Sequence, residues 1–164
     1  MKKNIIALLA IVTGFLVAAG STPRRSSADA GVPYPDGYRM WTHVKTGLIG
    51  PSSPSFQVSG GYHHIYANAK AMQGYTSGYF PEGSVLVFDV IEAKEQNGNT
   101  MEGERRHIDV MVKDSLQYAG TGGWGYEEFG GDSHTERVLT ATVRTQCVSC
   151  HSKKDDKVFS EFRK

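Results

Sequence analysis

The chain has only two cysteines, Cys147 and Cys150, and both lie near its C-terminal end. Because no cysteine lies directly after the apolar N-terminal segment, lipid attachment at that point is excluded. A structural zinc site needs four ligands, and the sequence has no further cysteine to complete such a site around this pair. Cysteine chemistry is therefore confined to one short segment.

A surplus of positive charge is also missing. The 18 lysines and arginines nearly balance the 17 aspartates and glutamates, which leaves a formal net charge of +1. Proteins that bind nucleic acid need a basic surplus to neutralise phosphates, so no nucleic-acid partner is expected. The chain also lacks internal repeats, and its length and apolar content suit one domain with its own core.

Long apolar runs are absent except for one at the N-terminus. Residues 5–19 are almost wholly apolar, follow Lys2 and Lys3, and end in small residues. This order is typical of a secretory signal peptide, so we expect residues 1–20 to be cleaved and the protein to be periplasmic or otherwise exported. The alternative is an uncleaved membrane anchor, although the run is short for a hydrocarbon core of ~30 Å.

The rest of the chain predicts a flexible leader over residues 21–33 and one folded domain over residues 34–164. Asn68 is placed to cap a helix that ends near Gly78, and a short helix is expected over residues 38–45. A loop is expected over residues 96–103. Apolar or alternating runs predict strands at residues 62–66, 84–93, 106–113 and 124–129. The expected fold class is α+β, a mostly antiparallel β-sheet with a few short helices.

The run Cys147-Val148-Ser149-Cys150-His151 carries the clearest chemistry. Two thiols at this spacing can each add to one vinyl group of a haem, and the adjacent histidine can bring its imidazole under the iron. The run therefore predicts one covalently attached haem c, with Cys147 and Cys150 as attachment points and His151 as the iron ligand. Export agrees with this, because bacterial c-type haem is attached outside the cytoplasm.

Two other uses of the cysteine pair stay open. One is a disulfide between Cys147 and Cys150 in an oxidising compartment. The other is a thioredoxin-like redox motif, although that motif follows a strand near the start of a βαβ unit.

The sixth position on the iron decides the class of function. A methionine or a second histidine there gives an electron carrier, whereas an open position gives a gas-binding or reactive centre. The candidates for that position are Met40, Met72, Met101, Met111, His43, His63, His64, His107 and His134.

Further motifs occur in a fixed order along the chain. They are Pro35-x-Gly37-Tyr38-Arg39-x-Trp41, Ile65-Tyr66-Ala67-Asn68-x-x-Ala71, Gly78-x-Phe80-Pro81-Glu82-Gly83-Ser84-Val85-Leu86-Val87, Val112-Lys113-Asp114-Ser115, Gly123-Trp124-Gly125-Tyr126, and the haem motif followed by Val158-Phe159-x-x-Phe162. On these motifs the chain resembles the cytochrome P-460 family, which includes the beta-type cytochromes c-prime.

The resemblance implies a β-rich, single-haem domain, often a homodimer, with His151 proximal and an open distal side. It implies a hydroxylamine or nitric oxide oxidoreductase that passes electrons to a protein partner. Members that oxidise hydroxylamine carry a lysine cross-linked to the porphyrin, and the matching position here is Tyr75 or Thr76. Without that lysine, the resemblance points to the members that bind nitric oxide or carbon monoxide. The alternative function is a non-enzymatic electron-transfer or gas-binding cytochrome.

The resemblance also implies the remaining site residues. Distal residues come from the segment 124–129, where Glu127 and Glu128 are the candidate catalytic acids. Neighbouring strand residues face opposite sides, so only one of the two is expected to enter the pocket. Phe129 is expected to shield it, Tyr75 to line the haem edge and Arg39 to pair with a haem propionate. Solvated acids, a packing tyrosine and a surface arginine are the alternatives.

Overall fold

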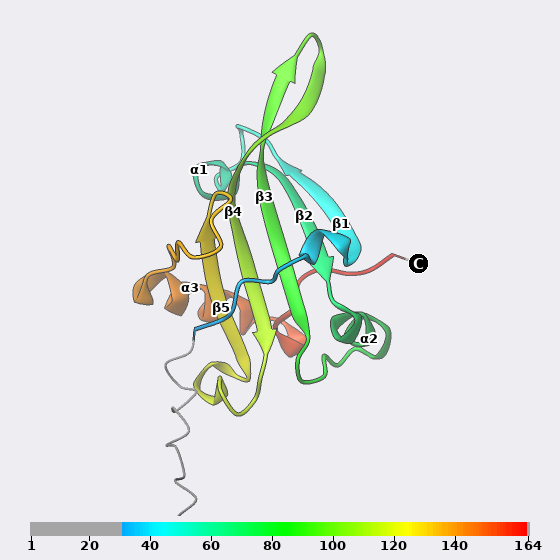
Figure 1. The fold of residues 1–164 in the computed structure, drawn as a ribbon, viewed down its shortest axis with the longest axis vertical. Coiled ribbons are helices and arrows are strands. Elements are labelled where there is room, and N and C mark those ends of the chain that lie inside the picture. Colours follow the sequence, from blue (N-terminus) through cyan, green and yellow to red (C-terminus); the bar gives the residue numbers. More distant parts are fainter. Residues whose placement is uncertain (1–30, 164) are drawn as a thin grey trace, which may run out of the picture.

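A computed structural model of the protein describes residues 31–163. The predicted signal peptide and the leader up to residue 30 lie outside the described residues. The centre of the fold is a five-stranded antiparallel sheet in the order β1-β2-β3-β4-β5 (Figure 1). Its strands are β1 (Thr42–Ile49), β2 (Gly61–Ala67), β3 (Val85–Gln96), β4 (Asn99–Lys113) and β5 (Trp124–Gly130).

The helices are short. They are α1 (Phe56–Ser59), α2 (Ala69–Ser77), α3 (Ala141–His151) and the 3-10 turns η2 (Tyr38–Met40), η3 (Ala119–Thr121) and η4 (Asp155–Lys157). The α+β class is confirmed. No helix within residues 31–163 has the length and apolar character needed to cross a membrane.

Local sequence explains how α2 begins and ends. The side chain of Asn68 accepts a hydrogen bond from the backbone N–H of Ala71 at 2.8 Å, which satisfies a donor of the first turn. Gly78 ends the helix with φ 82°, a left-handed conformation that glycine adopts without a Cβ clash. The helix predicted after Asn68 is thus confirmed.

Two local predictions are wrong, and strand pairing explains both. The helix expected over residues 38–45 stops at Met40, because the chain from Thr42 pairs with β2. The loop expected over residues 96–103 shrinks to a tight turn, since Asn97 and Gly98 both have positive φ and let β3 and β4 pair at once.

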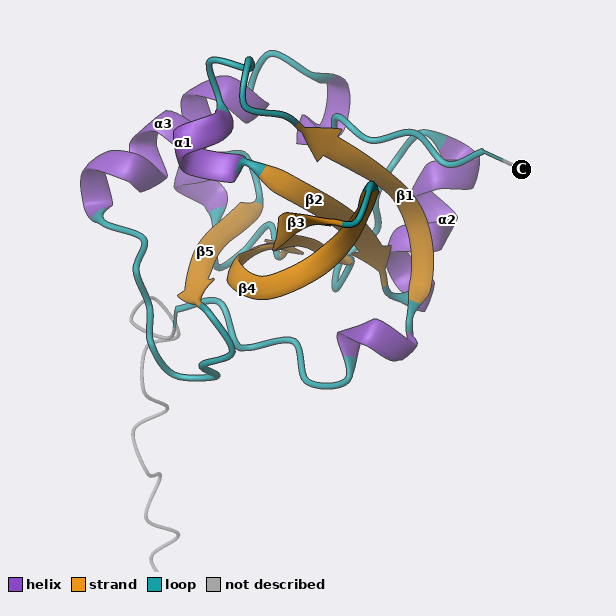
Figure 2. Cartoon of the chain, turned by 90° about the horizontal axis from the view of Figure 1, so that it is seen from above, coloured by secondary structure: helices purple, strands orange, loops and turns teal. Residues whose placement is uncertain are grey.

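The sheet separates two apolar clusters, because alternate residues of each strand point to opposite faces. The first cluster is built from Val44, Ala67, Ala71, Phe80, Leu86, Trp124 and Tyr126, and residues of α3 pack against it. The second is built from Val32, Tyr38, Val87, Ile108, Val110 and Phe129. The segment before β1 therefore covers one face while α3 covers the other, as the view from above shows (Figure 2).

Packed structure begins earlier than the sequence suggested. Val32, which falls in the predicted leader, is completely buried in the second cluster. Its backbone oxygen also accepts a hydrogen bond from Arg137 at 2.7 Å. The last residues of the leader are therefore part of the domain.

Candidate functional site

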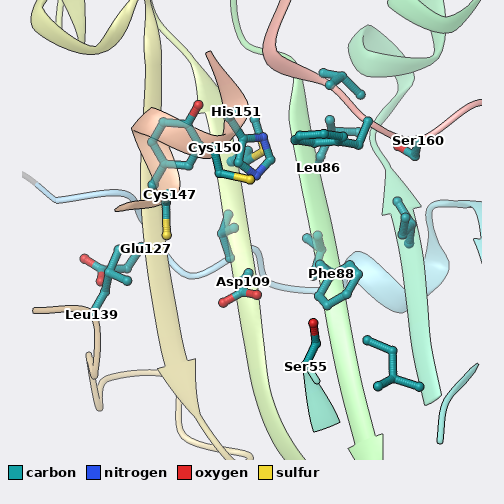
Figure 3. Close-up of a pocket in the computed structure, with 18 residues that line it drawn as sticks. Ser55, Leu86, Phe88, Asp109, Glu127, Leu139, Cys147, Cys150, His151 and Ser160 are labelled. Atoms are coloured by element: carbon teal, nitrogen blue, oxygen red, sulfur yellow. The ribbon is translucent and has the colours of Figure 1, made fainter. Parts of the chain in front are cut away.

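A cavity of about 620 Å³ lies between the sheet, α3 and the segment that follows α3 (Figure 3). Its wall is mostly apolar. The sheet contributes Ile49, Ile65, Leu86, Val87, Phe88, Asp109, Val110, Met111, Tyr126 and Glu127. The α3 region contributes Leu139, Cys147, Cys150 and His151. The C-terminal segment adds Val158, Phe159 and Ser160, and the loop before α1 adds Ser55. This size and lining suit a large, largely apolar ligand.

Helix α3 places the cysteine motif on this cavity. Thr140 caps the helix by accepting a hydrogen bond from Val143 at 3.3 Å. Residues three and four positions apart share one side of a helix, so Cys147, Cys150 and His151 all line the cavity. No disulfide joins the two cysteines. The motif also lies at the C-terminal end of its helix, unlike the redox motif that follows a strand.

The imidazole of His151 is held by its Nδ1 atom, which lies 2.6 Å from the backbone oxygen of Lys157. A carbonyl oxygen can only accept, so Nδ1 carries the proton and Nε2 keeps its lone pair. The ring packs between Tyr126 and Phe159, with centroid distances of 5.3 and 5.1 Å. Burial lowers the pKa of His151, and this favours the neutral form that binds metals. His151 is therefore oriented as a metal ligand through Nε2.

The structure adds Asp109, a cavity residue that sequence reasoning missed. Asp109 of β4 pairs directly with Glu128 of β5. A ring nitrogen of His107 and a carboxylate oxygen each of Asp109 and Glu128 lie within 4.8 Å of one another. Burial and the neighbouring Glu128 raise the pKa of Asp109 to about 8. The Asp109 side chain is 42% exposed and lines the cavity, and its carboxylate lies 3.8 Å from His107 Nε2.

Burial also shifts the pKa values of the groups around Asp109. Burial and then the charge of Glu127 raise the pKa of Glu128, while burial and then Arg106 lower the pKa of His107 to about 4. Burial raises the pKa of the Cys147 thiol, and the charges of Asp109 and Glu128 add to that effect. Burial and mutual repulsion therefore both raise the pKa of the acid pair, which lies close to the first cysteine of the motif.

The two glutamates predicted as catalytic acids have different surroundings. Glu127 touches the cavity wall, but its carboxylate accepts hydrogen bonds from Arg137 at 2.7 Å and Arg144 at 3.5 Å. Glu128 makes no hydrogen bond through its carboxylate to any residue within 31–163, and it stands beside Asp109. Glu127 is thus held by two arginines, whereas Glu128 is not part of the cavity wall but adjoins Asp109, which is.

Phe129 and Arg39 lie away from the cavity, and this corrects the expected position of Phe129. Phe129 is buried in the second cluster, with the Arg137 guanidinium 4.8 Å from its ring centroid. The strand pleat turns it to the side opposite Glu128, so it does not shield the cavity. Arg39 donates to the buried carboxylate of Asp89 at 3.0 Å, behind the sheet, so its predicted pairing with a propionate stays a prediction.

Tyr75 lies one layer behind the cavity wall. Its hydroxyl is 2.6 Å from the Ser160 hydroxyl, and Ser160 lines the cavity. Its ring packs edge-on against Phe80 at 5.1 Å. Lys70 donates to the backbone oxygen of Glu82 at 3.0 Å and is not part of the cavity wall. The tyrosine therefore supports the C-terminal segment, and its predicted role at the haem edge stays a prediction.

Met111 is the sixth-ligand candidate that the structure brings to the cavity. Met40 and Met101 are 90% and 56% exposed, and Met72 packs against the first cluster without lining the cavity. His151 is the one histidine in the cavity wall within the described part of the chain. Met111 is therefore the one of these candidates that lines the cavity.

A family model described as cytochrome P460 matches residues 35–160, which include all five strands, α3 and most of the C-terminal segment. No curated protein matches the chain.

Proposed function

The chain belongs to the cytochrome P460 family and is therefore a haem cytochrome, and from this premise we propose that it is an exported protein with one c-type haem attached at Cys147 and Cys150. The observation that carries the proposal is the meeting of Cys147, Cys150 and His151 on one apolar cavity. The hydrogen bond from His151 Nδ1 to Lys157 supports it further, since that bond presents Nε2 as the iron ligand.

The residues of the cavity fit a haem. Apolar side chains of the sheet and of the C-terminal segment offer a dry surface to the porphyrin, and the two thiols reach it from one turn of α3. When bound, the haem supplies an iron that exchanges electrons and can coordinate a small ligand. The Lys157 carbonyl increases the basicity of His151, and this strengthens its bond to a metal.

We propose nitric oxide or hydroxylamine as the ligand. We also propose that Asp109 and Glu128 accept the protons that the ligand releases on oxidation. Oxidation of hydroxylamine to nitric oxide releases protons as well as electrons. A carboxylate close to the ligand takes up such protons, and a carboxyl with a pKa of about 8 exchanges them near neutral pH. The electrons leave to a redox protein partner.

The alternative function is an electron carrier with Met111 on the iron. It is favoured by one observation, the presence of the Met111 side chain in the cavity wall. A thioether ligand would close the position that nitric oxide needs. Ligand binding therefore separates the two functions.

The test is a preparation made with a c-type haem maturation system, studied by intact mass and by oxidised, reduced and nitric-oxide-treated spectra. We expect the mass of one haem that survives denaturation, and a spectrum that changes on addition of nitric oxide. The double variant Cys147→Ala/Cys150→Ala is the matched control and should lose the covalent haem. A wild-type protein without haem mass would contradict the proposal, and a low-spin spectrum inert to nitric oxide would establish the electron carrier.

Export is tested separately. The full chain, expressed in a bacterium with a periplasm, should appear in the osmotic-shock fraction and lack its first residues by mass. Retention of the complete chain in the membrane fraction would support the anchor instead.

A further inference from the structure

The segment after α3 forms a strap over the haem cavity. The C-terminal strap, residues 155–160, brings Val158, Phe159 and Ser160 to the cavity wall. It also carries the Lys157 carbonyl that accepts the Nδ1 proton of His151. The orientation of the proposed iron ligand therefore depends on where the strap lies.

One side chain fastens the strap to the sheet. The Asp156 carboxylate accepts hydrogen bonds from the Phe80 backbone N–H at 2.6 Å, the Lys113 ammonium at 2.8 Å and the Trp124 indole N–H at 3.3 Å. These donors come from the loop after α2, the end of β4 and the start of β5. Only 13% of the Asp156 side chain and 7% of the Lys113 side chain are exposed, so the ion pair is shielded from water.

The backbone at this point is strained. Asp156 has φ 42° and Lys157 has φ 65°, and neither residue is glycine. Left-handed conformations of residues with a Cβ are unfavourable, and they persist where surrounding contacts hold them. Asp156 is both one of the strained residues and the one whose side chain is held. Loss of its contacts would therefore let this backbone relax and move the next carbonyl.

We infer that Asp156 is a positioning residue for the proximal ligand. Its carboxylate holds the strained strap in place, the Lys157 carbonyl is thereby kept against His151 Nδ1, and Nε2 is aimed at the iron. The hydroxyl pair of Tyr75 and Ser160, 2.6 Å apart, fastens the far end of the strap. This inference rests on the proposed function, because it concerns His151 as the haem ligand.

The test compares three holoprotein variants. Asp156→Ala removes the three hydrogen bonds of the Asp156 carboxylate, and Asp156→Asn keeps the shape of the side chain but loses the charge that pairs with Lys113. Asp155→Asn is the matched control, because Asp155 is exposed and makes no hydrogen bond or ion pair to any residue described in the structure. The readouts are the iron–histidine stretching frequency of the ferrous protein by resonance Raman and the reduction potential.

We expect Asp156→Ala to lower the iron–histidine frequency and raise the potential, because a histidine without its acceptor is a weaker donor to ferric iron. Asp156→Asn should shift both in the same direction by less, and Asp155→Asn should match the wild type. If Asp156→Ala does not mature, Asp156→Asn against Asp155→Asn decides the question. Equal values for those two variants would overturn the inference. A wild type without any iron–histidine band would instead overturn the proposed function.

Discussion

Asp109 of β4 and Glu128 of β5 lie directly opposite each other in the sheet. A carboxylate oxygen of each and a ring nitrogen of His107 lie within 4.8 Å of one another. Asp109 lines the cavity beside α3, and no hydrogen bond to a residue within 31–163 holds its carboxylate. Two acids in this position share a poor environment for negative charge, so one of them keeps its proton. This pair links the stability of the domain to the chemistry of its cavity.

Stability should fall as the pH rises from 6.5 to 8. Asp109 has a folded pKa of about 8 against an ordinary value of 3.8, so the folded state binds more protons between these values and loses stability as the pH rises. His107, lowered from 6.5 to about 4, acts in the opposite direction below pH 6.5. Melting temperatures of the wild type and Asp109→Asn across this range provide the measurement. Parallel curves for the two proteins would rule out the assignment.

Asp109→Asn should separate ligand binding from turnover. The variant keeps the shape of the cavity but cannot accept a proton, so the rate of hydroxylamine oxidation should fall by about 100-fold or more. Nitric oxide affinity should change little, because coordination to the iron needs no proton transfer. Steady-state oxidation and nitric oxide titration are the two measurements, with Asp155→Asn as control. Full activity in Asp109→Asn would remove this residue from the mechanism.

Met111→Leu should leave the haem spectrum unchanged if the sixth position is open. Leucine fills nearly the same volume, so the loss of stability should stay below about 1.5 kcal/mol. The absorption spectrum and the rate of nitric oxide binding are measured before and after the substitution. Conversion from a low-spin to a high-spin spectrum would identify Met111 as the iron ligand and favour the electron carrier.

Asp89→Ala should destabilise the domain without emptying the haem cavity. Asp89 is completely buried behind the sheet and accepts hydrogen bonds from Tyr38 at 2.7 Å, Arg39 at 3.0 Å and Arg105 at 2.8 Å. Removing this carboxylate leaves Arg105 largely buried without its partner, which costs about 3–5 kcal/mol. Denaturant unfolding measures the loss, and intact mass shows whether haem is still attached.

Arg39→Gln is the companion to that experiment. Arg39 is partly exposed, so its pair with Asp89 contributes only about 1 kcal/mol or less. The reduction potential should equal that of the wild type, because the arginine lies on the face opposite the cavity. A shifted potential would support the predicted contact between Arg39 and a haem propionate.

Much of the fold follows from local patterns. The strands expected at residues 62–66, 84–93, 106–113 and 124–129 all occur, because alternating apolar residues are stable only with one side against a core. The cap at Asn68 and the stop at Gly78 need only neighbouring backbone groups. The expected helix beyond Met40 failed, because its residues gain more by pairing with β2 than by helical propensity.

The sequence by itself determined the motif at Cys147 to His151, since a helix places residues at these spacings on one side wherever it packs. Family membership, and with it haem binding, was readable in the same way. Only the tertiary structure decided that Asp109 faces the cavity beside Glu128 and that Phe129 and Arg39 do not. It also decided that the Lys157 carbonyl accepts the hydrogen bond from His151 Nδ1 and that Asp156 fastens the strap to the sheet. These contacts depend on strand register and on segments distant in the chain, which no local spacing encodes.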